Sequence, residues 1–283
     1  MKTLVTGRNG FIARHLISRL ERDLHHQVQT TDRHTPCVLT LLNEFQPDII
    51  FHLGAELKNE SIMFEVNIGL TMLLIEWCKE KSKHTKLILF GSSSEYGRSN
   101  KPRAESHCPL PDTIYEGTKA ATAMLARAWA HTYHIPITFI RPFTIYGHDE
   151  KPNKLTSVLI QKWKDGSTLY LSEGMHDYVY IHDFIDALLV ITFWKETDCF
   201  NLVNIGSGKQ TSNSDFVRLF QKELGYVYPV KLVESGHAYD SMNWIADASI
   251  LQTKYGVTVG SLESGLKRLV AELTKGQETC SSE

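Results

Sequence analysis

Short apolar runs, each followed by an amphipathic stretch, recur through the first half of the chain. The apolar runs at residues 49–53, 86–90 and 135–143 are rich in Ile, Leu and Phe, as buried parallel strands are. Two further segments, residues 3–6 and 28–33, also read as strands, and both contain Val and Thr. Stretches with apolar side chains at helical spacing separate them, at residues 11–22, 67–77 and 115–129. This alternation predicts an α/β fold, a doubly wound parallel sheet of the Rossmann type.

The pattern loosens after residue 150, where shorter strands and amphipathic helices follow one another without a Pro/Gly-rich linker. We predict a dinucleotide-binding Rossmann domain over residues 1–150. A smaller, interleaved substrate-binding lobe is expected over residues 151–275, with some elements returning to the first domain. The polar residues 276–283 are expected to form a frayed tail.

Composition narrows the class of protein. The 283 residues carry a formal net charge of −2 and no basic block, which argues against nucleic acid as the main partner. Five cysteines are scattered and never form a CxxC pair, so we expect reduced thiols in a cytoplasmic protein and no metal site. No signal peptide is apparent and no apolar run is long enough for a bilayer, so no membrane association is expected.

A glycine turn lies between the first apolar run and the first amphipathic stretch. Gly7 would permit a tight turn, and Gly10 would let the backbone approach a pyrophosphate at the helix N-terminus. Ala13 is small enough for the helix to pack on the strand. The motif alone is equally compatible with an ordinary strand-to-helix turn.

Asp32 lies at the C-terminal end of the second predicted strand. It is close to the position, about 20 residues after the glycine turn, where an acid holds the adenosine ribose in dinucleotide-binding folds. A carboxylate there repels a 2′-phosphate and favours NAD. Arg8 and Arg33 could instead pair with that phosphate, so NADP remains an alternative. Asp32 could also be a simple turn or N-cap residue.

Tyr115 and Lys119 are four residues apart on the predicted helix over residues 115–129, and therefore share one face. A cation beside a tyrosine favours the phenolate and lowers the phenol's pKa from about 10. The pair could then exchange a proton with a substrate hydroxyl or carbonyl. Taken alone, this spacing is also what a solvated helix face shows.

Hydroxyl side chains follow the buried run 86–90, in the sequence Ser92-Ser93-Ser94-Glu95-Tyr96-Gly97. The carboxyl end of a parallel strand faces the crevice where ligands bind, so these hydroxyls are candidate substrate contacts. A serine-rich segment is otherwise an ordinary turn.

In their order along nearly the whole chain, these elements resemble the extended short-chain dehydrogenase/reductases, and within them the nucleotide-sugar epimerases, 4,6-dehydratases and 4-keto reductases. The matching pieces are Thr6-Gly7 to Ile12, Asp32, His52-Leu53-Gly54-Ala55, Asn67, Ser92-Ser93-Ser94, Tyr115 with Lys119, Arg141-Pro142-Phe143, Tyr146-Gly147, Asp177-Tyr178-Val179-Tyr180 and Asn204-Ile205-Gly206-Ser207-Gly208.

The resemblance implies an NAD(P)-dependent enzyme that exchanges a hydride with a carbon of a nucleotide-linked sugar. It implies Tyr115 as the acid/base, Lys119 as the residue that holds the nicotinamide ribose, and Ser93 as the hydroxyl on the sugar oxygen. It also implies a set of cofactor-binding residues: Gly7, Asn9, Gly10, Phe11, Ile12, Asp32, Arg33, Leu53, Gly54, Ala55, Asn67, Tyr115, Lys119, Pro142 and Phe143.

The reaction is left between 4-keto reduction and epimerisation, with 4,6-dehydration through Glu95 as an alternative. Glu95 could instead be a turn residue facing water. A non-catalytic dinucleotide-binding regulator is the alternative from another class. The resemblance further implies a homodimer, formed through the apolar helices that follow Asn67 and Tyr115.

The chain departs from the family's pattern where the substrate diphosphate would bind. His176 stands where an arginine is usual, and Thr144 replaces an asparagine. Ser93, Ser94, Thr144 and His176 are the predicted substrate contacts. His182, His237 and Lys231 are candidates to supply the missing positive charge.

Overall fold

The protein is described by a computed structural model covering residues 1–35, 37–234 and 243–280. The chain forms two compact units. Unit 1 comprises residues 1–97, 105–142 and 188–204, and unit 2 comprises residues 98–104, 143–187 and 205–283. Both units are built from segments that are discontinuous in sequence.

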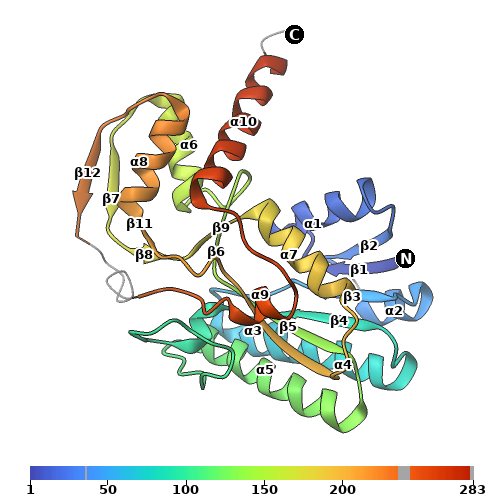
Figure 1. Cartoon of the computed structure of the whole chain (residues 1–283). Coiled ribbons are helices and arrows are strands. Elements are labelled where there is room, and N and C mark those ends of the chain that lie inside the picture. The colour runs from blue at the N-terminus through green and yellow to red at the C-terminus, as the bar shows by residue number, and fades with distance from the viewer. Residues whose placement is uncertain (36, 235–242, 281–283) are drawn as a thin grey trace. The chain divides into compact units, whose positions relative to one another are not determined.

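Unit 1 contains a six-stranded sheet in the order β10-β5-β4-β3-β1-β2 (Figure 1). Its pairs from β2 to β5 are parallel, with Val5 opposite Thr30 on one side and Phe51 on the other. The strands are β1 (Lys2–Thr6), β2 (Gln27–Thr31), β3 (Ile49–His52), β4 (Lys86–Phe90), β5 (Ile137–Pro142) and β10 (Phe200–Ile205).

The predicted parallel sheet is confirmed, and its order locates the ligand-binding edge. After β1 the chain adds β2 on one side and β3 on the other. This reversal is a topological switch point, where ligands bind outside the carboxyl ends of the strands. The glycine turn after β1 and the small residues after β3 both lie at this point.

Helices cover both faces of the unit 1 sheet, and their bounds are α1 (Phe11–Arg22), α2 (Val38–Phe45), α3 (Glu60–Phe64), the π-helical η1 (Glu65–Gly69), α4 (Leu70–Lys81), the 3-10 helix η2 (Ser93–Tyr96) and α5 (Ile114–Tyr133). One core cluster joins α4 and α5 to Leu4, Ile50 and Leu87 of the strands. Because side chains alternate along a strand, the neighbouring Val5 and Ile49 face the other side, and they too are buried.

Residues 60–81 form a continuous helical run that is long and apolar enough, by length and composition, to cross a membrane. This corrects our expectation that no such run exists. Part of it packs in the protein core, because Leu74, Ile75 and Cys78 are fully buried against the sheet. Packing in the unit 1 core therefore explains part of the apolar composition of residues 60–81. Such a run in a core helix is weak evidence for a membrane span.

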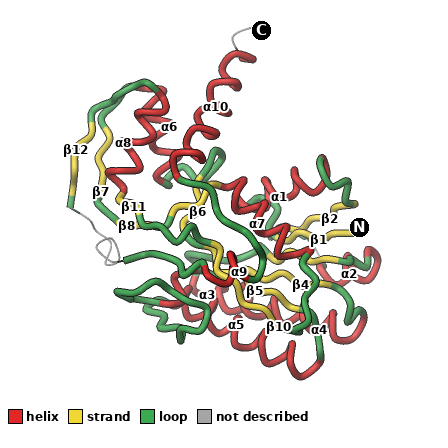
Figure 2. The backbone as a smooth tube through the Cα atoms, viewed as in Figure 1, coloured by secondary structure: helices red, strands yellow, loops and turns green. Residues whose placement is uncertain are grey.

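Unit 2 is built on three two-stranded sheets, β6–β9, β7–β12 and β8–β11 (Figure 2). The strands are β6 (Thr144–Tyr146), β7 (Leu169–Ser172), β8 (Met175–His176), β9 (Tyr178–Tyr180), β11 (Thr211–Ser212) and β12 (Val230–Val233). The helices are α6 (Leu155–Asp165), α7 (Ile181–Phe193, whose last six residues belong to unit 1), α8 (Asn213–Leu224), α9 (Ser249–Thr253) and α10 (Leu262–Cys280).

Helix α10 extends to Cys280, whereas the sequence predicted fraying from residue 276. Residues 281–283 lie outside the described part. Within unit 2, α10 packs on α8 and on β9. The domain boundary predicted at residue 150 stays a prediction, because the two units interleave along the chain.

Candidate active site

The glycine turn after β1 has the backbone conformation that glycine alone adopts readily. Gly7 has φ of +73°, and a Cβ on it would lie 2.8 Å from the Cα of Gly54. A Cβ on Gly10 would lie 3.1 Å from the carbonyl oxygen of Gly7. The ends of β1 and β3 therefore meet with no room for side chains, which leaves the backbone open to a ligand from outside.

Hydrogen bonds of the Thr6 side chain hold the ends of β1 and β3 close together. Thr6 Oγ1 accepts the N–H of Gly54 at 3.1 Å and lies 2.7 Å from Nδ1 of His52. Thr6 therefore joins the segment after β3 to the His52 ring within β3. Burial, and then the charge of Lys119, lower the pKa of His52 to about 3, so the ring is neutral.

Asp32 lies at the end of β2, and its carboxylate accepts the N–H of His34 at 2.9 Å. Its Oδ2 is 3.3 Å from Nε of Arg8. The His34 hydrogen bond, with smaller contributions from Arg8 and Asn9, holds the pKa of Asp32 below its ordinary value. The charged carboxylate and the exposed Arg8 and Arg33 all lie at this end of β2, so the features that favour NAD and NADP are both present.

These features fit a dinucleotide. Side chains at Gly7, Gly10 and Gly54 would fill the space next to the backbone that a pyrophosphate would occupy. Helix α1 begins directly after Gly10, so its N-terminal N–H groups lie at this turn, and the Asp32 carboxylate lies at the end of β2. The other predicted lining residues of this edge, Phe11, Ile12, Leu53 and Ala55, are half-buried.

Asn67 is buried in the π-helical turn η1 and joins two parts of unit 1. Its side chain accepts the N–H of Glu56 at 2.8 Å and donates to the carbonyl of Glu56 and to the hydroxyl of Thr118, both at 3.0 Å. The hydroxyls of Thr71 and Thr122 donate to the Asn67 carbonyl. Asn67 thus ties the segment that follows β3 to helix α5.

Helix α5 positions Tyr115 and Lys119 at the carboxyl end of β4. A capping box between Thr113 and Glu116 begins the helix just before Tyr115. Nζ of the buried Lys119 donates to the carbonyl oxygen of Phe90, the last residue of β4, at 2.8 Å. Burial lowers the pKa of Lys119 to about 8.

The predicted lowering of the Tyr115 pKa is wrong for the protein alone. Burial, and then the charges of Glu95 and Glu116, raise that pKa to about 12. Lys119 is directed to the Phe90 carbonyl instead of the phenol, so in this state its charge does not favour the phenolate.

The serine turn places its three hydroxyls differently. Ser93, the predicted substrate contact, is 5% exposed, whereas Ser92 and Ser94 are half-buried. Ser92 caps η2, accepting the N–H of Ser94 at 3.1 Å, and the two Oγ atoms are 2.7 Å apart. Ser93 is therefore the most buried of the three serines, and its assignment as the substrate contact stays a prediction.

Glu95 does not face the solvent. It is fully buried, its Oε1 accepts the N–H of Ser92 at 2.7 Å, and its Oε2 is 2.8 Å from both Nε and Nη2 of Arg141. Burial raises its pKa, against the charge of Arg141. Glu95 is therefore not a turn residue facing water. Both of its oxygens have partners in the protein, and its role as a dehydratase acid/base stays a prediction.

Most of the predicted residues beyond β5 belong to unit 2. Phe143 is buried there, and its N–H donates to the carbonyl of Ile205. Thr144 Oγ1 is 3.4 Å from Nδ1 of His176, whose ring packs on Tyr178. These two predicted substrate contacts therefore lie together.

Of the candidates for the missing positive charge, His182 faces the carboxylate of Glu272 at 3.3 Å and is less suited to an anion. Lys231 is exposed on β12, and His237 lies outside the described residues. Pro142 ends β5 in unit 1.

Sequence analysis missed Thr6 as the partner of His52, Thr118 as the partner of Asn67, and Arg141 as the partner of Glu95. These pairs are 46, 51 and 46 residues apart, so no local spacing indicates them. The only available signal was a charged residue within an otherwise apolar strand, at Arg141.

Comparison with known proteins agrees with this geometry. The model of the NAD dependent epimerase/dehydratase family matches residues 3–206, so the chain belongs to that family. A "Probable UDP-glucuronate 4-epimerase" of Rhizobium meliloti is 26% identical, over 95% of this chain and 96% of the relative.

Two solved structures share the fold. The UDP-glucuronic acid 4-epimerase of Bacillus cereus, in complex with UDP-glucuronic acid and NAD, has a TM-score of 0.83 at 25% identity, over 97% of this chain and 99% of that chain. The dTDP-glucose 4,6-dehydratase of Bacillus anthracis, in complex with NAD, has a TM-score of 0.84 at 22% identity, over 98% of both chains. The protein is an enzyme of the extended short-chain dehydrogenase/reductase class, as the resemblance implied.

Proposed function

We propose that the protein is an NAD-dependent 4-epimerase of a nucleotide-linked sugar. The observation that carries the proposal is the position of Lys119, whose hydrogen bond to the Phe90 carbonyl places the Tyr115 pair beside the serine turn. The relatives that act on UDP-glucuronate support the substrate class.

Different residues of the protein would bind the cofactor and transfer the proton. The backbone around Gly7 and Gly10 receives the pyrophosphate, and Asp32 accepts hydrogen bonds from the adenosine ribose. The Lys119 ammonium would hold the nicotinamide ribose, either after leaving the Phe90 carbonyl or while donating to both groups. Tyr115 takes the proton from the sugar hydroxyl and later returns one.

Bound oxidised NAD would supply the hydride acceptor and a positive charge beside the phenol. A positive charge is what Tyr115 needs to act as a base, since its pKa is about 12 in the protein alone. We therefore expect Tyr115 to become an effective base only in the loaded enzyme.

Ser92 is the hydroxyl that we assign to the sugar oxygen, in place of Ser93. It is two residues beyond the end of β4, it is more exposed than Ser93, and its Oγ lies beside that of Ser94. Ser92→Ala should reduce turnover more than Ser93→Ala does, and a larger effect at Ser93 would contradict the assignment.

Dehydration through Glu95 is disfavoured by the buried ion pair with Arg141. Reduction of a 4-keto sugar remains the second candidate function, because Arg8 and Arg33 near Asp32 could accommodate NADPH as a consumed reductant.

The test is to denature the purified protein, identify the released nucleotide, and incubate the native protein with UDP-glucuronic acid. Stoichiometric NAD and a 4-epimeric product at equilibrium would support the proposal. An empty protein that oxidises added NADPH with a 4-keto sugar would overturn it in favour of reduction.

We also propose a cytoplasmic homodimer joined through α3 and α5, whereas the sequence indicated the helices that follow Asn67 and Tyr115, which are α4 and α5. Exposed apolar side chains gather on these two contacting helices, with Phe64 63% and Met124 56% exposed. Light scattering should give twice the monomer mass, and Met124→Glu should shift the protein towards monomer. A wild-type monomer at micromolar concentration would contradict this.

A further inference from the structure

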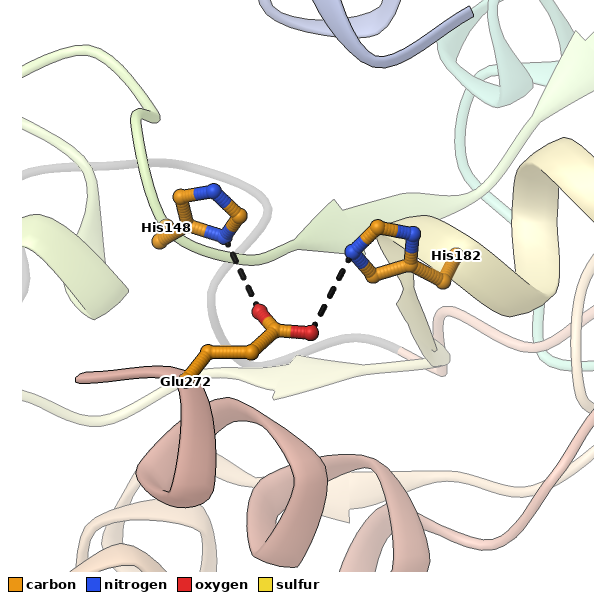
Figure 3. Close-up of side chains that lie close together, drawn as sticks. All are labelled: His148, His182 and Glu272. Carbon is orange, nitrogen blue, oxygen red and sulfur yellow. Dashed lines mark ion pairs between the residues drawn. The ribbon is translucent and has the colours of Figure 1, made fainter. Parts of the chain in front are cut away.

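Two histidines and one glutamate converge in unit 2, outside the predicted cofactor and substrate residues except for His182. His148 follows β6, His182 lies in the first turn of α7, and Glu272 lies on α10 (Figure 3). Figure 3 shows the carboxylate between the two rings, with one oxygen directed towards each. The three side chains are 34%, 39% and 37% exposed, so a small ion can reach them from solvent.

The spacing of the nitrogen and oxygen atoms is close to that of ligands on one metal ion. His148 Nδ1 is 3.1 Å from Glu272 Oε2, and His182 Nε2 is 3.3 Å from Glu272 Oε1. Two ligands of a tetrahedral ion with bonds of about 2.0 Å are separated by about 3.3 Å. One potential ligand atom from each residue lies within 4.8 Å of the others, so a closure of at most about 1.5 Å would place all three on an ion.

The contact between His148 and Glu272 is close but poorly aligned for a direct hydrogen bond. Glu272 Oε2 is buried and makes no hydrogen bond of good geometry among the described residues. Burial, and then the interaction with Glu272, raise the pKa of the nearby Tyr180 phenol.

The surroundings also suit a metal ligand set. Nε2 of His148 faces away from Glu272 and lies 3.7 Å from a carboxylate oxygen of Asp149, and a metal-bound imidazole commonly directs its second nitrogen to such a group. Arg268, the nearby cation, is paired with Asp183 on α7, so its charge is compensated.

We propose that His148, His182 and Glu272 bind one Zn²⁺ ion, with solvent in the remaining position. Two imidazoles and one carboxylate are a donor set that Zn²⁺ accepts. The ion would join the segment after β6, the start of α7 and α10, which are held here only by non-covalent contacts. None of the three residues is among those that we assign to proton transfer, so the ion would lie outside the proposed catalytic groups.

The sequence predicted no metal site because no two of these ligands are close along the chain. His148 and His182 are 34 residues apart, and Glu272 is 90 residues beyond His182. No spacing of the kind seen in local zinc motifs results. Only the fold brings the three residues together.

The experiment uses the untagged full chain, freed of metal by chelation and then given one to five equivalents of Zn²⁺. Bound zinc is measured after gel filtration, and Tm with and without zinc. Wild type should retain one zinc per chain and gain about 5–10 °C in Tm when zinc exceeds its Kd by about 100-fold. His148→Gln, His182→Gln and Glu272→Gln should each lose the bound zinc and the shift in Tm.

His84→Gln is the matched control, since it removes an exposed histidine of unit 1 and should keep both the zinc and the Tm shift. Replacing Zn²⁺ by Co²⁺ adds a readout independent of stability, namely visible d–d absorption that appears in the control and is absent from the cluster variants. Zinc content and cobalt absorption that are equal in the control and in all three cluster variants would overturn the proposal. So would a wild type that retains no zinc and is merely stabilised by protonation of the histidines at acid pH.

Discussion

Each unit contains a carboxylate held by cationic or titratable partners, but the two settings differ in burial. Glu95 in unit 1 is fully buried and paired with Arg141, which is charged at every accessible pH. Glu272 in unit 2 is over a third exposed and faces two histidines, whose charge depends on pH. The first carboxylate is therefore a permanent part of the core, and the second can exchange its partners for protons or an ion.

The difference shows why a carboxylate near a candidate site is not automatically an acid/base. Glu95 is next to the serine turn, and the sequence made it a candidate for dehydration. In the fold, it closes the capping box of η2 and neutralises the arginine of β5. A carboxylate can exchange a proton with a substrate only if it is accessible and not already paired. Burial and existing partners therefore distinguish a structural carboxylate from a functional one.

The largest expected effect comes from breaking the buried pair. Arg141→Met should lower the free energy of unfolding by about 3–5 kcal/mol, because it leaves the Glu95 carboxylate buried without its partner. Urea denaturation measures this loss. The double variant with Glu95→Gln should recover part of it, and a single variant as stable as wild type would show that the pair contributes little.

A smaller effect is expected from Lys119, a buried cation whose folded-state pKa is about 8. The unfolded lysine has a higher pKa and binds more protons, so folding stability should rise as pH increases from about 8 to 10. Relative to Lys119→Met, wild type should gain on the order of 2 kcal/mol over this range. Unfolding measured at pH 7.5, 9 and 10 tests the slope, and parallel curves would contradict it.

The smallest effect should come from Glu272→Gln in metal-free protein at pH 7. Because the carboxylate is over a third exposed, we expect a loss below about 1 kcal/mol. Burial would raise the pKa of Glu272, but its contacts with His148, His182 and Tyr180 outweigh burial and hold that pKa below its ordinary value. The contribution should therefore be present at pH 7 and decline as pH falls below about 4.3, the ordinary pKa of glutamate, and urea unfolding at pH 7 and pH 3 checks both points.

The strands and the glycine turn were predictable because their signals are local. A strand buried on both faces must be a continuous apolar run, as Leu4-Val5 and Ile49-Ile50-Phe51 are. The turn at Gly7 needs a positive φ, and a glycine directly after such a run indicates it. Tyr115 and Lys119 were found for the same reason, since helical spacing puts them on one face.

What the sequence could not predict depends on contacts between distant segments. Lys119 donates to the carbonyl of Phe90, 29 residues away, and burial together with the charges of Glu95 and Glu116 raises the pKa of Tyr115. The choice between Ser92 and Ser93 depends on which hydroxyl the η2 helix turns into the core. Ser92 and Ser93 are both serines of one turn, but Ser92 is half-buried and Ser93 is buried, so only the fold distinguishes them.

The most direct test of the account is the turnover of Tyr115→Phe in protein that carries its nucleotide. The variant keeps the ring and its packing but lacks the proton that we assign to catalysis. We predict that it binds as much NAD as wild type and converts UDP-glucuronic acid about 10²–10⁴-fold more slowly. Turnover equal to that of wild type, with NAD bound, would contradict the central claim that Tyr115 carries the proton.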